Sequence, residues 1–251
     1  MSAHFRPEDS SQALVVVPTF DERDSISEVA RRLFDAAGDR VDLLVVDDSS
    51  PDGTADLVRQ LIEGPRDIHL LERPTKMGLG TAYVEGFRWA LERGYRAVVS
   101  MDADLSHDPA AVPSLLDALD DAGLAIGSRY VPGGGVSNWG KFRRLLSRAG
   151  NVYAKICLGY GVEDSTSGFR AYDADLLRRL DLGTIKAEGY AFQIEMTWRA
   201  ILAGEKVVEI PITFVERTAG KSKLSRGIVV EALFRVTKWG LSRLRRRRPL
   251  G

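Results

Sequence analysis

The chain is predicted to be an α/β protein with a mostly parallel sheet and helices on both faces. Short, continuously apolar runs alternate with segments of helical periodicity between residues 14 and 104, the rhythm of consecutive strand–helix–strand units. The runs lack polar alternation, as expected of strands that are buried on both faces. The 251 residues are 44% hydrophobic, which is enough apolar material for one large core.

The first half supplies four strands and three helices in regular alternation. Each strand is a short apolar run that ends in turn-forming or acidic residues, and each helix carries apolar residues at a helical spacing. The strands are expected at residues 14–17, 41–48, 68–72 and 96–104, and the helices begin near residues 25, 54 and 78.

The second half is less periodic but continues the same mixture. Its expected elements are a strand at 125–130, a helix at 143–158, a short strand at 167–172, a helix at 188–203, and a strand at 206–217 that Pro211 interrupts. We divide the chain into a polar tail at residues 1–12, a main domain at 13–225 and a basic C-terminal helix and tail at 226–251.

The C-terminal helix is predicted to be amphipathic. A polar stripe recurs at helical spacing, and apolar residues lie opposite to it. The stripe consists of Glu231, Arg235, Lys238, Ser242 and Arg245, and the opposite face of Val229, Leu233, Val236 and Leu244.

The charges are unevenly distributed. The chain has 35 basic and 35 acidic residues, but residues 221–251 contain ten bases and one acid, a net charge of +9 that leaves −9 for residues 1–220. A basic end on an acidic body indicates a polyanionic partner, either a membrane surface, a nucleic acid or a phosphorylated ligand. The sequence lacks an interleaved aromatic and basic pattern, so no nucleic acid is expected.

Cysteine usage and hydropathy indicate the compartment. Cys157 is the single cysteine, which excludes an internal disulfide and fits a reducing environment. No apolar stretch reaches the roughly 18 residues of a transmembrane helix, and the first residues lack the basic-then-apolar order of a secretory signal. The expected location is the cytoplasm.

Acidic residues follow the strand at 96–104. Asp102 and Asp104 flank Ala103 at the carboxyl end of this strand. In parallel sheets, ligands bind beyond the carboxyl ends of the strands. Two carboxylates at this spacing can hold Mg²⁺ or Mn²⁺ against the phosphates of a ligand. The alternative is a turn with two solvated acids, because Asp-x-Asp alone is common.

Two other strand ends carry candidate binding residues. Asp47 and Asp48 precede a turn, and one of them either hydrogen-bonds a base or ribose or simply belongs to the connection before the next helix. Pro18 to Glu22 follow the first strand, with Phe20 as a stacking surface and Glu22 as a polar clamp, or form an ordinary helix start.

These motifs together resemble glycosyltransferase family 2, whose members have the GT-A fold. The resemblance rests on PTFDE at 18–22, VVDDSSPDGT at 45–54, DAD at 102–104 and GSRY at 127–130. DSTSGFRAY at 164–172 and FVERTAGKSKL at 214–224 are more specific and resemble the polyprenol-phosphate (dolichol-phosphate) mannose synthases within that family. The resemblance covers residues 13–225, which it implies are a GT-A catalytic domain.

The resemblance also implies roles for individual residues. Asp104 is expected to bind the metal directly, whereas Ser106 stands where relatives often have Gln and is a second ligand that reaches the metal only through water. The donor-binding positions are Pro18, Phe20, Glu22, Val46, Asp48, Asp102, Ala103 and Asp104. Arg129 is expected to contact phosphate, and Arg217 and Lys223 to lie on a loop that closes over the diphosphate, so that Asp104, Arg129, Arg217 and Lys223 are the catalytic set.

Further cations are candidates for binding the acceptor phosphate. They are Lys141, Arg143, Arg144 and Arg148, of which Arg143, Arg144 and Arg148 could instead form a solvated helix face. Arg170 either binds phosphate or pairs with Asp164.

The implied reaction moves mannose with inversion from GDP-mannose to a polyprenyl monophosphate, with Mg²⁺ or Mn²⁺ as cofactor. An ionised phosphate needs no general base, in keeping with the absence of histidine from these motifs. The alternatives are a UDP-glucose or other UDP-sugar donor, or a non-catalytic nucleotide-binding subunit.

A polyprenyl acceptor requires contact with a bilayer. The C-terminal helix, with Trp239 on its apolar face and Arg243 and Arg245 to Arg248 beyond, resembles an anchor on anionic lipid. The alternative is a helix packed on the core with a solvated basic tail. We therefore expect a peripheral protein on the cytoplasmic face of a membrane, using this helix or a membrane-protein partner.

Overall fold

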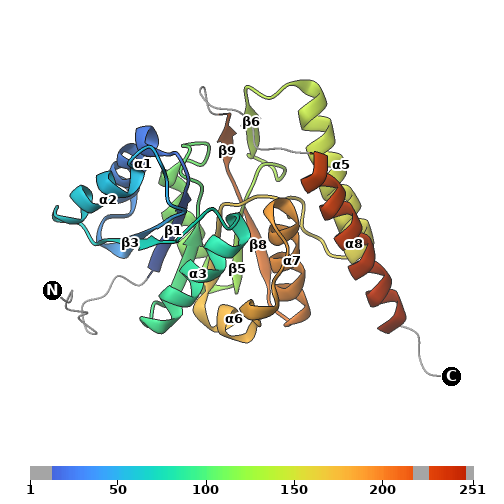
Figure 1. Ribbon diagram of the computed structural model, residues 1–251. Helices are drawn as coiled ribbons and strands as arrows, with labels where there is room; N and C mark the ends of the chain where they lie inside the picture. Colours follow the sequence, from blue (N-terminus) through green and yellow to red (C-terminus); the bar gives the residue numbers. More distant parts are fainter. Residues whose placement is uncertain (1–12, 217–225, 247–251) are drawn as a thin grey trace.

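A computed structural model describes residues 13–216 and 226–246 (Figure 1). For residues 226–230 and 244–246 it describes the helical backbone only. The expected tail at 1–12 lies outside the described residues. A seven-stranded sheet with the order β3-β2-β1-β4-β7-β5-β8 forms the centre. Its strands are β1 (Ala13–Thr19), β2 (Val41–Asp47), β3 (Ile68–Glu72), β4 (Ala97–Ser100), β5 (Leu124–Ser128), β7 (Arg170–Asp173) and β8 (Val207–Pro211).

The sheet is mostly parallel, as the sequence predicts. β1 pairs in parallel with β2 and with β4, β2 with β3, and β5 with β8. β7 runs antiparallel to both of its neighbours, β4 and β5. The carboxyl ends of β1, β2 and β4 therefore meet at one edge of the sheet, which is where the candidate acids were expected.

Both faces of the sheet are buried. Along β1, Leu14 and Val16 contribute to one apolar cluster, while Val15 and Val17 contribute to the cluster on the other face. This explains why the strands are continuously apolar, since successive side chains point to opposite faces and both faces are covered.

Helices cover both faces, as predicted (Figure 1). One face packs against α1 (Arg23–Ala37), α2 (Thr54–Ile62) and α4 (Val112–Asp117), and the other against α3 (Leu79–Glu92), α6 (Ala174–Arg179) and α7 (Gly189–Leu202). Short 3-10 helices lie at Gly38–Arg40, Pro109–Ala111, Ala118–Asp120 and Leu182–Thr184.

The strand expected at 206–217 is divided into two. Pro211 ends β8, and after Ile212 the chain continues as β9 (Thr213–Val215), which leaves the main sheet. β9 pairs in parallel with β6 (Gly135–Ser137) in a separate two-stranded sheet. Proline cannot donate a ladder hydrogen bond, so this is a natural position for the chain to change sheets.

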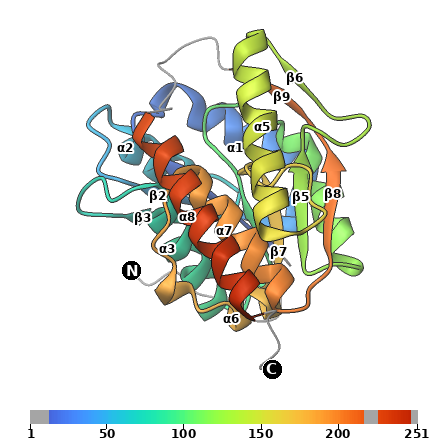
Figure 2. The same ribbon diagram turned by 90° about the vertical axis from the view of Figure 1, so that its right-hand side faces the viewer.

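Two long helices, α5 (Lys141–Leu158) and α8 (Arg226–Arg246), lie side by side outside α7 (Figure 2). Gly240 of α8 packs on Cys157 of α5. The hydroxyl groups of Tyr153 and Thr237 join the two helices across 2.6 Å. No helix among the described residues is long and apolar enough to cross a bilayer.

The C-terminal segment is a helix, as predicted, but its expected apolar face is split. Val236 is buried in the core, and Trp239 packs on that core with its ring 5.6 Å from that of Trp198. Leu233, which was expected on the same face, is exposed. The expected polar stripe is also partly engaged, because Arg235 bonds Glu231 and the carbonyl of Lys186.

Candidate active site

A cavity of about 580 Å³ opens at the carboxyl ends of β1, β2 and β4. Its size is that of a site for a nucleotide-sized ligand. Eight of the lining residues are predicted site residues, namely Pro18, Phe20, Glu22, Asp48, Asp102, Ala103, Asp104 and Ser106. The structure thus brings together three segments that are spread over residues 18–106 of the sequence.

Asp102 is held in place by two neighbours. The hydroxyl of Tyr83 donates to Oδ1 of Asp102 at 3.0 Å, and the backbone N–H of Asp102 donates to Nδ1 of His107 at 3.4 Å. Burial, reinforced by the negative charge of Asp102, raises the pKa of Tyr83 well above its usual value. Tyr83 is therefore a permanent donor to this carboxylate.

His107 lies beneath the acidic loop. It is buried between Phe169 and Phe214, with ring centroids 5.1 and 5.3 Å away, and is not among the residues that line the cavity. Burial lowers its pKa, although Asp102 and Asp104 act in the opposite direction. A neutral imidazole that accepts at Nδ1 shapes the loop and does not act as a base in the cavity.

Asp104 and Ser106 form a tight local unit. The N–H of Ser106 donates to Oδ1 of Asp104 at 3.0 Å, and the carbonyl of Ser106 accepts from Val215 at 3.1 Å. Ser106 is buried and lines the cavity next to Asp104. The backbone N–H of Ser106 therefore orients the carboxylate of Asp104.

The acidic loop fits a hard divalent cation that keeps several ligand positions open. Asp102 and Asp104 offer carboxylate oxygens only, the type that Mg²⁺ and Mn²⁺ prefer. In the described part of the chain, no group of three or more His, Cys, Asp or Glu side chains forms a closed metal cage. A cation here would take its remaining ligands from phosphate oxygens and water.

The wall formed by β1 and β2 carries the expected aromatic ring. Nζ of Lys76 lies 3.7 Å from the centroid of Phe20, and both residues line the cavity. Asp48 accepts from Nε of Arg73 at 2.5 Å and from the N–H of Met77 at 3.2 Å. Asp48 therefore holds the loop that carries Lys76, in addition to facing the cavity.

Three non-glycine residues near the cavity have a left-handed backbone. Asp21, Ser49 and Leu105 follow β1, β2 and β4, with φ values of 60°, 54° and 59°. This conformation is disfavoured for residues with a Cβ atom and tends to cluster at functional sites. Its recurrence after all three strands supports the assignment of this edge as the site.

One basic residue reaches the cavity from α5. Arg143 pairs with Glu216, and its guanidinium carbon lies 4.3 Å from the centroid of Trp139. Arg143 and Glu216 both line the cavity. Of the four cations predicted near this helix start, Lys141, Arg144 and Arg148 are exposed and are not among the cavity-lining residues.

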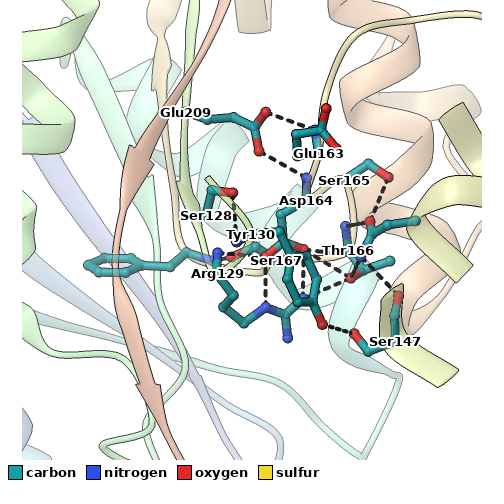
Figure 3. Close-up of polar contacts among 12 residues, drawn as sticks. Ser128, Arg129, Tyr130, Ser147, Glu163, Asp164, Ser165, Thr166, Ser167 and Glu209 are labelled. Carbon is teal, nitrogen blue, oxygen red and sulfur yellow. Dashed lines mark hydrogen bonds and ion pairs between the residues drawn. The ribbon is translucent and has the colours of Figure 1, made fainter. Parts of the chain in front are cut away.

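Arg129, which the resemblance implies contacts phosphate, has its guanidinium carbon 5.7 Å from the ring centroid of the cavity-lining residue Phe214. It is buried and forms a bidentate ion pair with Asp164, and it also donates to Thr166 (Figure 3). It is not among the residues that line the cavity. Asp164 is fully buried, and a buried carboxylate requires a buried cation beside it, which explains why the guanidinium of Arg129 is buried.

Arg170 and Val46 differ from expectation. Arg170 is fully buried, and it donates to the carbonyls of Ser165, Ser167 and Gln193 instead of pairing with Asp164. The side chain of Val46 is fully buried in the core and is not among the cavity-lining residues. Arg217 and Lys223 lie outside the described residues.

Sequence reasoning missed several lining residues. Lys76, Glu188, Tyr190 and Phe214 line the cavity. Oε2 of Glu188 accepts from the N–H of Gly80 in the first turn of α3 at 2.9 Å, and burial raises the pKa of Glu188. No spacing in the sequence links Glu188 to the acidic loop, because α7 reaches the cavity only through tertiary packing.

The fold and the site define a glycosyltransferase of the GT-A fold. A mostly parallel sheet ends in an acidic Asp-x-Asp loop beside an aromatic wall, in a cavity of nucleotide size. The model of the family described as "Glycosyl transferase family 2" matches residues 14–181, and the chain belongs to this family.

Two curated relatives match nearly the whole chain. An undecaprenyl-phosphate mannosyltransferase of Micrococcus luteus is 50% identical over 231 residues, covering 92% of this chain and 95% of the relative. A polyprenol monophosphomannose synthase of Mycolicibacterium smegmatis is 48% identical over 234 residues, covering 92% and 88%.

A solved structure shares the fold. Glucosyl-3-phosphoglycerate synthase of Mycobacterium tuberculosis, solved with Mn²⁺, UDP and glucosyl-3-phosphoglycerate, has a TM-score of 0.64 and 20% identity, covering 94% of this chain and 81% of that one. This likeness shows the GT-A fold.

Proposed function

We propose that the protein is an inverting glycosyltransferase that moves mannose from GDP-mannose to a polyprenyl monophosphate and releases GDP. The observation that carries the proposal is the high identity, over nearly the whole chain, with two relatives whose names specify this sugar and this class of acceptor. The cavity supports it, because an acidic loop and a basic residue face the same space.

The acceptor phosphate is its own nucleophile. A phosphate monoester is ionised near neutral pH, with a second pKa of about 6, so no side chain has to remove a proton. One phosphate oxygen forms a bond to the anomeric carbon, while the bond from that carbon to the donor diphosphate breaks and GDP leaves with the electron pair. The absence of histidine from the residues lining the cavity agrees with this scheme.

Asp102 and Asp104 are the residues that would hold Mg²⁺ or Mn²⁺. When bound, the cation would neutralise charge on the diphosphate leaving group. Tyr83 and Ser106 keep the two carboxylates oriented through the hydrogen bonds described above. Phe20 offers its ring to the donor base, and Glu22 and Asp48 offer carboxylates to the ribose. Arg217 and Lys223 remain proposed partners of the diphosphate.

Arg143 is the residue that we assign to the acceptor phosphate. Its guanidinium faces the cavity from the first turn of α5 and is balanced by Glu216. A doubly charged phosphate competes well for a guanidinium that a single, partly buried carboxylate holds. Arg129, by contrast, acts through Asp164 as a positioning residue.

A transfer assay tests the proposal. Purified protein is mixed with a polyprenyl phosphate, Mn²⁺ or Mg²⁺, and radiolabelled GDP-mannose or UDP-glucose, and label in the organic phase is counted. Metal-dependent mannolipid from GDP-mannose is expected. Label from UDP-glucose alone contradicts the mannose assignment, and no label from either donor contradicts the proposed activity of the isolated chain.

A further inference from the structure

The outer face of α5 is apolar and has nothing packed on it among the described residues. Phe142, Leu145, Val152 and Ile156 follow one another at helical spacing and are 78%, 67%, 52% and 73% exposed. Asn151, Ala154 and Leu158, on the opposite side of the helix, are buried. The helix is therefore apolar on the side that it does not use for folding.

The neighbouring helix extends this surface. Leu233, Phe234 and Leu241 of α8 are 43%, 69% and 55% exposed. Thirteen large apolar side chains are exposed in the described part of the chain, and eight of these lie on the two helices, five on α5 and three on α8. The fifth on α5 is Leu146, which is 41% exposed. Because α5 and α8 lie side by side (Figure 2), we call these eight residues the α5–α8 face.

Both helices are rich in basic residues. α5 contains five basic residues and no acid, and α8 contains six basic residues and one acid, Glu231. Lys141, Arg144 and Arg148 are exposed on α5, as is Lys238 on α8. Apolar side chains with lysine and arginine beside them are typical of surfaces that bind anionic lipid headgroups and the acyl chains below them.

We propose that the α5–α8 face docks on an anionic membrane surface, with α5 as the principal contact. The charge argues against a second copy of the chain as the occupant, because two such faces would bring the exposed bases of both copies together, namely Lys141, Arg144, Arg148 and Lys238. The inference rests in part on the proposed function, which places the acceptor in a bilayer. It moves the principal contact from α8 to α5, because Val236 and Trp239 of α8 face the core.

Docking through α5 also orients the cavity. Phe142 is exposed on the outer side of the first turn, and the next residue, Arg143, lines the cavity. The apolar residues from Phe142 to Ile156 span about 21 Å along the helix at 1.5 Å per residue. A helix lying in the headgroup region would therefore hold the cavity mouth at the level where a lipid phosphate is found.

Vesicle binding tests the proposal without any donor or turnover. The triple variant Phe142→Ser, Leu145→Ser and Ile156→Ser removes three exposed side chains, and the control Ile62→Ser with Leu202→Ser removes two exposed apolar side chains from α2 and α7. Co-sedimentation with vesicles of phosphatidylcholine containing phosphatidylglycerol is measured, together with thermal unfolding. The triple variant is expected to lose at least about tenfold in partition coefficient, with the control and both melting curves unchanged.

Several results would overturn the inference. The wild-type protein could fail to bind the anionic vesicles, or the triple variant could bind them as well as the wild type does. Binding that occurs only when the vesicles contain a membrane protein would also contradict docking on lipid. A wild-type dimer in sedimentation that the triple variant dissociates, with vesicle binding unaffected, would assign the face to a second copy. Vesicle binding needs no catalysis, so the two proposals can fail separately. If the wild-type protein transfers no sugar but binds vesicles, and the triple variant does not bind them, only the proposed function is contradicted.

Discussion

Nε and Nη2 of Arg129 each donate at 2.7 Å to a different carboxylate oxygen of Asp164, in a buried bidentate pair (Figure 3). The backbone N–H of Arg129 donates to the same carboxylate at 2.9 Å, and Asn151 reaches it at 3.4 Å. The pair joins the end of β5 to the loop before β7 and thereby fixes the start of the segment that leads to α5.

The substitution Asp164→Asn should destabilise the protein by roughly 3 kcal/mol, because it leaves Arg129 buried without a counter-charge. Asp117→Asn is the matched control, since Asp117 pairs with Arg40 in an exposed ion pair at 2.6 Å and such pairs contribute less than about 1 kcal/mol. Urea unfolding measures both values. Equal, small losses would contradict a structural role for the buried pair.

The same pair predicts a pH dependence. Burial opposes ionisation of Asp164, but the charge and hydrogen bonds of Arg129 outweigh it, so the pKa of Asp164 is lowered from its ordinary value of 3.8. The contribution to stability is therefore fully present above pH 3.8 and is lost as the pH falls toward the lower folded-state pKa. The difference in unfolding free energy between wild type and Asp164→Asn should shrink below pH 3.8, and a difference that stays constant down to pH 2 would refute this.

Asp104→Ala should lower kcat at least about a hundredfold, the scale on which charge stabilisation at a reacting centre usually acts. Mn²⁺ affinity in the presence of GDP should fall with it, as measured by titration. Asp121→Ala, an exposed carboxylate outside the cavity lining, should leave both values unchanged. Near-normal turnover of Asp104→Ala would remove this residue from the site.

Gly240→Ala should loosen the contact between α5 and α8. A Cβ atom at Gly240 would lie 2.9 Å from the carbonyl oxygen of Cys157, whereas a Cβ atom at Gly150 on α5 would meet nothing within 4 Å. We expect Gly240→Ala to cost about 1–3 kcal/mol through overpacking, and Gly150→Ala to gain up to about 1 kcal/mol through helix propensity. Thermal unfolding measures both, and a neutral Gly240→Ala would show that the helices adjust freely.

Local pattern alone was enough to predict most of the framework. The apolar runs, the helical spacing and the acids at strand ends predict the order of elements, the mostly parallel sheet and the edge where Phe20, Asp48 and Asp104 meet. These features follow from chain connectivity, because a strand buried on both faces must be apolar throughout and successive parallel strands must end at one edge.

Only the tertiary structure decided which side chains of each helix or strand point into the core, into the cavity or to the surface. Arg129 directly follows β5 and Arg143 lies in the first turn of α5, yet only Arg143 lines the cavity, because Asp164 holds Arg129 inside. Glu188 joins the site only because α7 packs beside α3. On α8, Trp239 turned inward and Leu233 outward, and the widest apolar face appeared on α5. Periodicity identifies a face of a helix, but only packing against its neighbours decides whether that face is buried or left for a partner.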